Sequence, residues 1–441
     1  MSAPEATTIG QGQAGPTRGQ RIKKDYNEAI PSICIERAVC YTRSHRETGG
    51  QPLIVRRARA FQEACEHIPV TIYPNELIVG NRGGERRAGC VNPEVSWRWV
   101  EEEMERFEIR EQDPYRITAR QKEVLRNEVF AYWKGQSLEE AYLARLPDET
   151  ARVVVDTGVV DNDSKWRAYV GEITPDFQDV IFPQGFAGIR AEAEAHLRLL
   201  EPTSAENLEK MHFYQAAIIT STALIRLGER YAEKAEELAR TEPDPTRKQE
   251  LLRSAENCRR VPANPPRTFW EAMQMVWFVQ VGRAIAENAV ALNLGRFDQY
   301  MFPYYQRDVA AGILTPEQAQ ELIECLWIKL SEWVWAISTN TARFFAGYCA
   351  FQNLTVGGRK RDGTDGTNAL SYMCLRATAN VRTHQPGLSV RIHPDSPEEF
   401  LLEVCRLIRL GTGFPAVHND RTGSAMLLAA GLSPADARDW N

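Results

Sequence analysis

The sequence predicts a helix-rich α/β protein, and three observations support this class. Capped amphipathic helices dominate, as in Thr315-Pro316-Glu317-Gln318, a capping box that precedes apolar residues at the 3.6-residue period. Strand signals are few and short, and in the second half single strands alternate with long helices. The first half reads as mostly helical. This order is typical of a sheet or barrel with its helices outside.

Each predicted helix rests on a start signal or on apolar periodicity. Thr268 and Glu271 form a second capping box, and Ser396-Pro397 opens a further helix. Ser433-Pro434-Ala435-Asp436 has the same form near the end of the sequence. The resulting helices are expected at 205–240, 247–258, 269–284, 316–335, from 397 to about 410, and at 433–440.

The predicted strands are two clear segments and two weaker ones. Residues 388–393 alternate apolar Leu388, Val390 and Ile392 with polar side chains, and residues 353–358 end in a Gly-Gly turn. Ile78-Val79 and 153–155 are the weaker candidates. No internal repeat with a period of 20–50 residues is visible.

Composition restricts the class of function. At 441 residues and net charge -6, the chain is long enough for two or three domains or one large one. The acidic balance argues against nucleic acid or an anionic membrane as partner. Nine cysteines without a C-x-x-C pair favour reduced thiols over disulfides or a zinc site. The sequence also lacks an apolar run long enough to span a membrane, and both observations favour a cytoplasmic protein. Residues 1–24 are expected to be a disordered lead before one domain at 25–441.

Individual residues give no strong catalytic motif. The sequence has no phosphate-binding loop, dinucleotide fingerprint, H-E-x-x-H or G-x-S-x-G. His418-Asn419-Asp420 fits acid–base chemistry, but also a polar loop in which Asn419 or Asp420 caps a helix. Glu172 and Asp176 could be surface acids at a turn. The tryptophans of 327–335 are expected in the core.

Several stretches together resemble the pyruvate formate-lyase-like glycyl radical enzymes. The matching segments occur in the same order as in the family and together cover about residues 25–441, so the resemblance is more specific than any single motif. The segment "ICIERAVCYTRSHRETGG" begins its first block, and "GFPAVHNDRTGSAMLLAAGLSPADARDW" is similar to the piece before the family's catalytic cysteine loop. The blocks are 33–82, 267–280, 295–329, 353–368 and 413–440.

The resemblance implies the first half of a ten-stranded α/β barrel, built from two antiparallel five-stranded halves. A thiyl-radical cysteine and a radical-storing glycine would lie on loops that meet inside it, shielded from water and oxygen. Neither loop is recognisable here, so no cysteine of this chain receives the catalytic role. The expectation is an amino-terminal part, from a truncated, frameshifted or split gene. Its open edges and inner apolar face would make it poorly stable and inactive alone.

The resemblance also implies candidate site residues. Glu172 stands where dehydratase-type members usually carry the histidine of G-H-x-x-x-D, so it is a possible acid or base. Arg343 and His418 are candidate anchors for a carboxylate. The aromatic side chains of 342–353 would face a pocket: Phe344, Phe345, Tyr348 and Phe351. Such a pocket favours decarboxylation of an arylacetate, or addition of a hydrocarbon radical to fumarate.

Cofactors and partners follow from the same resemblance. The chain itself is expected to bind no cofactor or metal, since it lacks cluster-ligand spacing. The complete enzyme would need a glycyl radical installed by an S-adenosylmethionine-dependent, iron–sulfur activating enzyme, and would be a homodimer acting on a small organic molecule. A non-catalytic scaffold, or the remnant of a broken gene, is the alternative.

Overall fold

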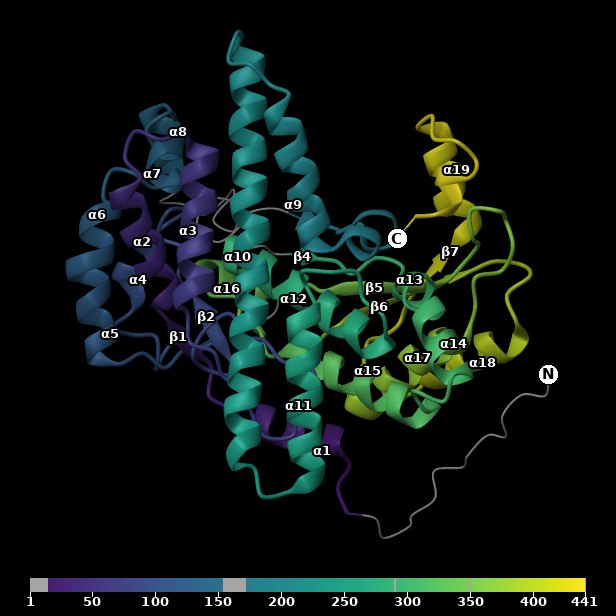
Figure 1. Ribbon diagram of the computed structural model, residues 1–441. Helices are drawn as coiled ribbons and strands as arrows, with labels where there is room; N and C mark the ends of the chain where they lie inside the picture. The colour runs from purple at the N-terminus through teal and green to yellow at the C-terminus, as the bar shows by residue number, and fades with distance from the viewer. Residues whose placement is uncertain (1–14, 154–171, 289–290, 349, 441) are drawn as a thin grey trace.

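The computed structural model describes residues 15–153, 172–288, 291–348 and 350–440. Three parts lie side by side in it: an amino-terminal group of helices, a group of long helices along one flank, and a sheet with its covering helices (Figure 1). The class is the predicted helix-rich α/β one.

Helix α1 (Arg18–Glu28) begins inside the segment 1–24 that composition predicts to be disordered. The reason is a capping box: Thr17 Oγ1 accepts from the Gln20 backbone N–H, while the Gln20 side chain accepts from that of Thr17. Residues 1–14 lie outside the described ranges.

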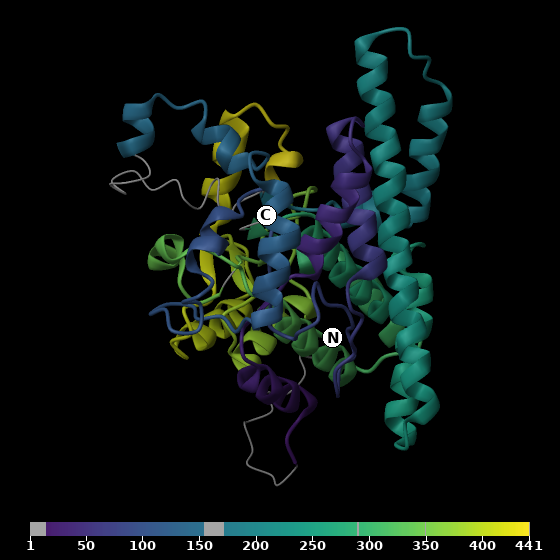
Figure 2. The same cartoon turned by 90° about the vertical axis from the view of Figure 1, so that its left-hand side faces the viewer.

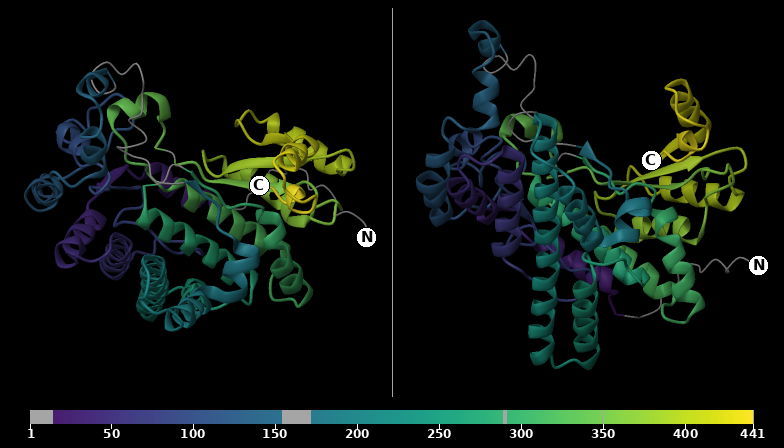
Figure 3. Two further views of the ribbon diagram at one scale, coloured as in Figure 1. Left: turned by 90° about the horizontal axis from the view of Figure 1, so that it is seen from above. Right: turned by 45° about the horizontal axis from the view of Figure 1, so that its top comes forward.

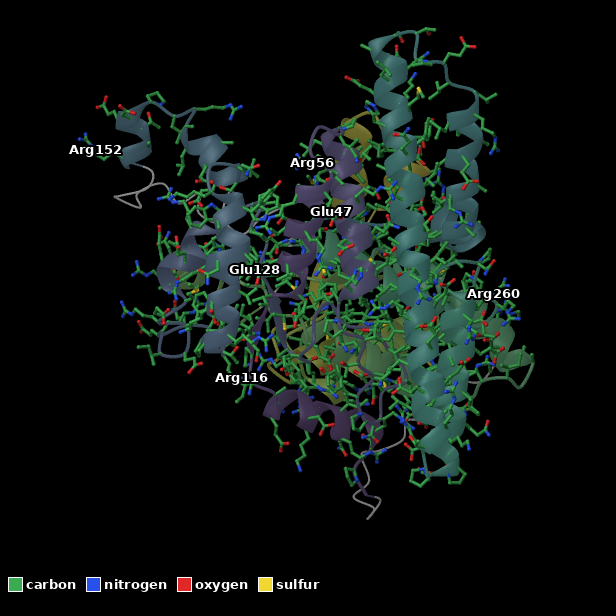
Figure 4. The ribbon with its side chains drawn as sticks, turned by 60° about the vertical axis from the view of Figure 1, so that its left-hand side comes forward. Glu47, Arg56, Arg116, Glu128, Arg152 and Arg260 are labelled. Carbon is green, nitrogen blue, oxygen red and sulfur yellow. The ribbon has the colours of Figure 1, made fainter. Side chains whose placement is uncertain are left out.

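The amino-terminal helices pack around two short parallel strands, β1 (Ser32–Cys34) and β2 (Ala88–Cys90). Figure 4 shows this side of the molecule, where Arg56 joins three helices: its guanidinium donates to the His45 carbonyl (2.9 Å) and to Tyr132 Oη (3.2 Å). The helices are α2 (Glu36–Glu47), α3 (Leu53–His67), α4 (Arg98–Glu103), α5 (Ala119–Val124), η1 (Leu125–Phe130), α6 (Ala131–Trp133), α7 (Leu138–Leu143) and α8 (Asp148–Arg152).

Three long helices form one flank of the molecule, which is seen most clearly in Figure 2. They are α9 (Phe182–Arg198), α10 (Ala205–Thr241) and α11 (Pro245–Arg260), and the last two confirm the helices predicted at 205–240 and 247–258. Gly228 lets α10 pack closely against the segment that follows α11, because a Cβ at this position would lie 2.7 Å from Pro262 Cδ.

The central sheet is parallel and open. Its strands are β3 (Glu172–Ile173), β4 (Ala291–Leu292), β5 (Asn353–Gly357), β6 (Gly387–Ile392) and β7 (Ala416–Asn419). β3 pairs with β4, and β5 with β6 and then β7. Bridges from Ala291 to Phe351 and from Gly295 to Leu354 join the two sets, so the strands follow one another across the sheet (Figure 3).

Apolar helices cover one face of this sheet. Leu354, Val356, Leu388 and Val390 are at most 1% exposed and belong to the main core with α12, α15, α17 and α18. Helices α12 (Phe269–Ala286), α15 (Pro316–Ser331) and α18 (Glu398–Ile408) confirm three predicted helices. The remaining elements are η4 (Phe177–Ile181), α13 (Phe297–Tyr300), α14 (Phe302–Ala310), α16 (Thr339–Phe345), α17 (Ala369–Val381), α19 (Asp420–Ala429) and η5 (Asp436–Arg438).

Several predicted elements need correction. α15 ends at Ser331 instead of 335, because Val334 pairs with Gly89 and the Trp335 backbone donates to Tyr348. The helix predicted at 433–440 is only the 3-10 turn η5; Ser433 Oγ accepts from the Asp436 N–H, but the N-cap residue of η5 is Ala435.

Ile78-Val79 is not a strand. Gln274 of α12 takes both backbone groups of Val79, accepting from its N–H (2.9 Å) and donating to its carbonyl (2.7 Å). The Gln274 side chain thus forms the two hydrogen bonds that a neighbouring strand would otherwise form with Val79. The candidate at 153–155 lies almost wholly outside the described residues. Within the described ranges, none of the helices combines the length and the apolar character needed to cross a bilayer.

Candidate functional site

The face of the sheet opposite the apolar core carries polar side chains. In register across the parallel strands, Asn353 stands beside Gly387, Thr355 beside Ser389, and Gly357 beside Arg391 and then His418. Residues in register share a face, and alternate residues along a strand share it too. We call Asn353, Thr355, Ser389, Arg391 and His418 the polar face. The expectation of an apolar inner face is therefore wrong, since the apolar residues of β5 and β6 all point to the helices.

An aromatic cluster lies at the amino-terminal end of β5. The rings of Phe345 and Phe351 have centroids 6.3 Å apart, and Phe345 also lies 5.9 Å from Trp335, both edge-on. Phe351 is 47% exposed and Phe345 half-buried, while Trp335 belongs to a small core cluster of its own. Of the aromatic side chains predicted to line a pocket, Phe345 and Phe351 therefore lie against each other.

Glu172 stands in the same row of the sheet as this cluster. Its backbone is in register with Ala291, and Ala291 with Phe351. The side chain of Glu172 lies outside the part of the structure that is described. Asp176, four residues on, is exposed and accepts a hydrogen bond from the Asp179 N–H, so it caps η4.

The other residues predicted for the aromatic segment lie elsewhere. Phe344 is 64% exposed, and Arg343 is exposed on the same short helix, α16. Tyr348 donates to the Pro114 carbonyl (3.0 Å), and its ring meets that of Tyr115.

His418 lies at the opposite, carboxyl-terminal end of the strands. From Phe351 to Gly357, the residue in register with Arg391 and His418, the chain advances six residues, which corresponds to about 20 Å along the strand. The structure therefore does not gather the predicted site residues in one place. His418 meets Trp440 edge-on, with ring centroids 5.9 Å apart, and Asn419 caps α19 as predicted.

Arg391 is the charged centre at this carboxyl end, and its side chain is fully buried. It forms an ion pair with Asp420, also buried, and its Nε donates to Asp420 Oδ1 at 2.8 Å. Its other nitrogens donate to the carbonyls of Arg438 (2.6 Å) and Trp440. Burial, with nearby Arg296, lowers the pKa of Arg391 to about 10, so the guanidinium remains charged at neutral pH.

A second buried group fixes the turn after β5. Asp298 accepts hydrogen bonds from the Gly357 N–H (2.8 Å) and from Ser371 Oγ, and burial raises the pKa of this carboxyl. Arg296 beside it donates to the Gly357 carbonyl (3.0 Å) and pairs with Asp439 (2.8 Å). The carboxyl end of the sheet is thus a network of buried charges.

Sequence reasoning missed Arg391, although its signal was present. In "LSVRIH" the alternation that points Leu388 and Val390 to the core points Arg391 to the other face. The network requires an arginine at this position, the glycine that ends β5 and the one after it, and an acid after β7.

The described cysteines lie away from the polar face. Seven of the eight are buried, and only Cys405 is exposed. Burial raises the pKa of the Cys374 thiol well above its ordinary value, and that of Cys40 to about 11. Among described residues, Glu63, Glu66 and His67 of α3 form a group with spacing suitable for a metal, but Glu63 already pairs with Arg43 (2.8 Å).

Comparison with known proteins gives a consistent result. The sequence profile of the family described as "Pyruvate formate lyase-like" matches residues 11–441. Isethionate sulfite-lyase from Desulfovibrio desulfuricans is 34% identical over 430 residues, covering 95% of this chain and 52% of that protein. This chain spans about half the length of the curated relatives it matches.

Solved structures agree closely over the same part. A protein studied for 1,2-propanediol dehydration in Roseburia inulinivorans superposes with TM-score 0.93 at 36% identity, over 97% of this chain and 53% of its own. A glycyl radical enzyme from Archaeoglobus fulgidus gives TM-score 0.90 at 34% identity, over 96% of this chain and 54% of its own.

Proposed function

Because this chain belongs to the pyruvate formate lyase-like family, whose members here are glycyl radical enzymes, we propose that it forms the amino-terminal part of a radical lyase acting on a small organic substrate. The observation that carries this proposal is the polar face of the parallel sheet. Its side chains are polar on the side opposite the apolar core: Ser389 Oγ donates to Asn353 Oδ1 (3.2 Å), Asn353 is half-buried and His418 is exposed. Such a wall suits a substrate with hydroxyl or anionic groups.

Cleavage of a carbon–heteroatom bond is the reaction class we favour. The similar proteins are a sulfite-lyase and a diol-dehydrating protein, whose names imply loss of a C–S and a C–O substituent. Elimination of this kind needs a group that moves a proton at the substrate, and Glu172 is our candidate for that role. Its backbone lies in the row that ends at Phe351.

Decarboxylation of an arylacetate, or addition of a hydrocarbon radical to fumarate, is the second candidate. It is supported by the exposed edge of Phe351 beside Phe345, which would accept an aromatic ring. Arg343 would then be the candidate carboxylate anchor, with Phe344 at the rim, whereas His418 lies about 20 Å away along the strands and could not bind the same small molecule. A scaffold without catalysis is the remaining alternative, and the downstream gene sequence considered below separates it from both.

The remaining parts of the reaction belong to other polypeptide. We propose that the catalytic cysteine and the radical-bearing glycine follow in sequence beyond this chain, and that a radical S-adenosylmethionine enzyme installs the radical. The complete enzyme would be a cytoplasmic homodimer, and residues 25–441 would form one of its domains. This chain alone would then be inactive.

A radical assay tests this division. The chain is incubated anaerobically with an activating enzyme and S-adenosylmethionine, and its paramagnetic resonance spectrum is recorded. We expect no glycyl doublet from this chain alone. A doublet would show that the radical glycine is already among these 441 residues.

The gene downstream of codon 441 and the polypeptide it encodes test the function itself. A continuation with a G-C-V motif and a glycine loop would supply an enzyme to assay on isethionate, 1,2-propanediol and an arylacetate. Glu172→Gln should lower kcat by about 100-fold or more, while Asp176→Asn, which keeps the η4 cap, should not. Unrelated sequence after a true stop codon would contradict the proposed function. Full activity of Glu172→Gln would contradict the role of Glu172.

A further inference from the structure

Trp440 lies on the polar face of the sheet. Its indole ring stacks under the Arg391 guanidinium, with 4.3 Å from Cζ to the ring centroid, and it meets His418 edge-on. Arg391 and His418 stand in one row of that face. Contact with both places the end of the described chain over the carboxyl ends of β6 and β7.

Glycine 423 makes room for this ring. A Cβ on Gly423 of α19 would lie 2.5 Å from two ring carbons of Trp440, well inside contact distance. The indole is therefore held between α19 on one side and Arg391 on the other. This position depends on a particular small residue, which argues that the seat is specific.

The surroundings of Arg391 are shaped for the same contact. The turn after β5 passes close to its side chain, and a Cβ on Gly358 would lie 2.5 Å from Arg391 Nε. Gly357 and Gly358 have φ of +74° and +76°, a backbone conformation that glycine adopts without strain. Three segments, after β5, after β7 and at 438–440, thus converge on one guanidinium.

The geometry points to Arg391 as a positioning residue that holds segment 433–440 on the polar face and so fixes where the polypeptide after Trp440 enters it. Only arginine offers the required donors: Nε and one Nη reach Asp420, while the carbonyls of Arg438 and Trp440 take the others. A lysine has a charge but no planar fork. That the positioned polypeptide is the catalytic loop rests on the function proposed above.

Additional ion pairs support the segment from its outer side. Asp439 pairs with Arg296 (2.8 Å) and with Arg361 (3.4 Å), and Asp436 pairs with Arg361. Arg361 is half-exposed and its pairs contribute little. Arg296 and Arg391 are both buried, but Arg296 holds the Asp439 side chain, whereas Arg391 holds the Arg438 and Trp440 carbonyls and the Trp440 ring. Removal of Arg391 should therefore loosen the segment while the sheet stays folded.

Hydrogen–deuterium exchange of the purified chain tests this inference. Arg391→Met should speed exchange of the amides of 433–440 by about tenfold or more, while the β5 and β6 amides stay protected. Arg406→Met is the matched control, because Arg406 is exposed and pairs only along α18 with Glu403. Unchanged exchange at 433–440, or equal loss of protection throughout the sheet, would overturn the assignment.

Two further variants separate positioning from general stability. Arg391→Lys keeps the charge, and we expect it to leave exchange at 433–440 fast; full rescue would show that the fork is not needed. Gly423→Ala removes no charge and should still displace Trp440, which a 5-fluorotryptophan label reports as a shifted ¹⁹F resonance, assigned with Trp440→Phe. An unshifted resonance would contradict the packing argument even if Arg391→Met failed to fold. None of these readouts requires radical chemistry, so they leave the proposed function to its own test.

Discussion

Lys329 shows how a single buried charge can organise this protein. Its ammonium group lies 2.8 Å from Glu76, 2.8 Å from Glu332 and 2.9 Å from Asn81 Oδ1, and its side chain is 2% exposed. Arg86 adds a second cation beside Glu332. Burial raises the pKa of Glu76 despite the opposing pull of Lys329. The charges balance within the cluster, which joins α15 to the segment before β2.

Replacing Lys329 by Met should therefore be severely destabilising. It leaves two buried carboxylates with one remaining cation, a change that typically costs about 3–5 kcal/mol in the free energy of unfolding. Urea unfolding measures the loss. The matched control is Lys210→Met on α10, whose pair with Glu206 (2.6 Å) is exposed to solvent and should contribute little to stability. Equal effects of the two changes would refute the cluster's importance.

At this scale the sequence could predict little of the site. Lys329 and Glu332 appear in it only as interruptions of an apolar run, because their partner Glu76 is more than 200 positions away. The role of Arg391 could not be predicted for the same reason, because Asp420 and Trp440 are distant in sequence and contact it only in the folded protein. The core positions of Trp327, Trp333 and Trp335 were predictable, because apolar spacing is a local signal.

Among elements, helices could be predicted well because their start signals are local. Thr315 accepts from the Gln318 N–H, and the Gln318 side chain accepts from the Thr315 N–H (2.9 Å), as the sequence indicates. The strands were harder. β5 and β6 were found, but β1, β2, β3, β4 and β7 have only two to four residues and depend on distant partners.

A cap substitution on α15 gives a prediction at this scale. Thr315→Ala removes the acceptor for the Gln318 N–H and should lower the free energy of unfolding by about 1 kcal/mol. Thr315→Ser keeps the hydroxyl and should remain within a few tenths of a kcal/mol of the original. Thermal unfolding of the three proteins decides the matter: an alanine variant as stable as the serine variant would show that the cap contributes nothing.

The whole molecule should respond to acid through His384. Its Nδ1 lies 3.3 Å from Tyr26 Oη, which joins α1 to the segment after α17. Burial, and then Arg87, lowers the pKa of His384 from 6.5 to about 4. Between these values the unfolded chain binds the extra proton, so the free energy of unfolding falls as pH falls from about 6.5 to 4.

His384→Asn tests this link. Asparagine keeps a polar group near the Nδ1 position but does not titrate, so the variant should lose less stability on acidification than the original chain. The difference between pH 7 and pH 4 should approach about 3 kcal/mol at most. Urea unfolding at several pH values measures it, with His67→Asn as control because His67 is half-exposed on α3. Parallel pH profiles for all three proteins would exclude His384 as a source of acid sensitivity.

The order of the parallel pairings has a consequence for synthesis. Ser32 pairs with Ala88, Glu172 with Ala291 and Ser389 with Ala416. In each pair the second strand is synthesised well after the first, so the first strand cannot pair until then. The β6–β7 pairing can therefore form only after residues 416–419 have left the ribosome, and until then β6 presents an unpaired edge on that side. We expect a chain truncated after residue 415, which lacks β7, to be retained by chaperones far longer than the 441-residue chain.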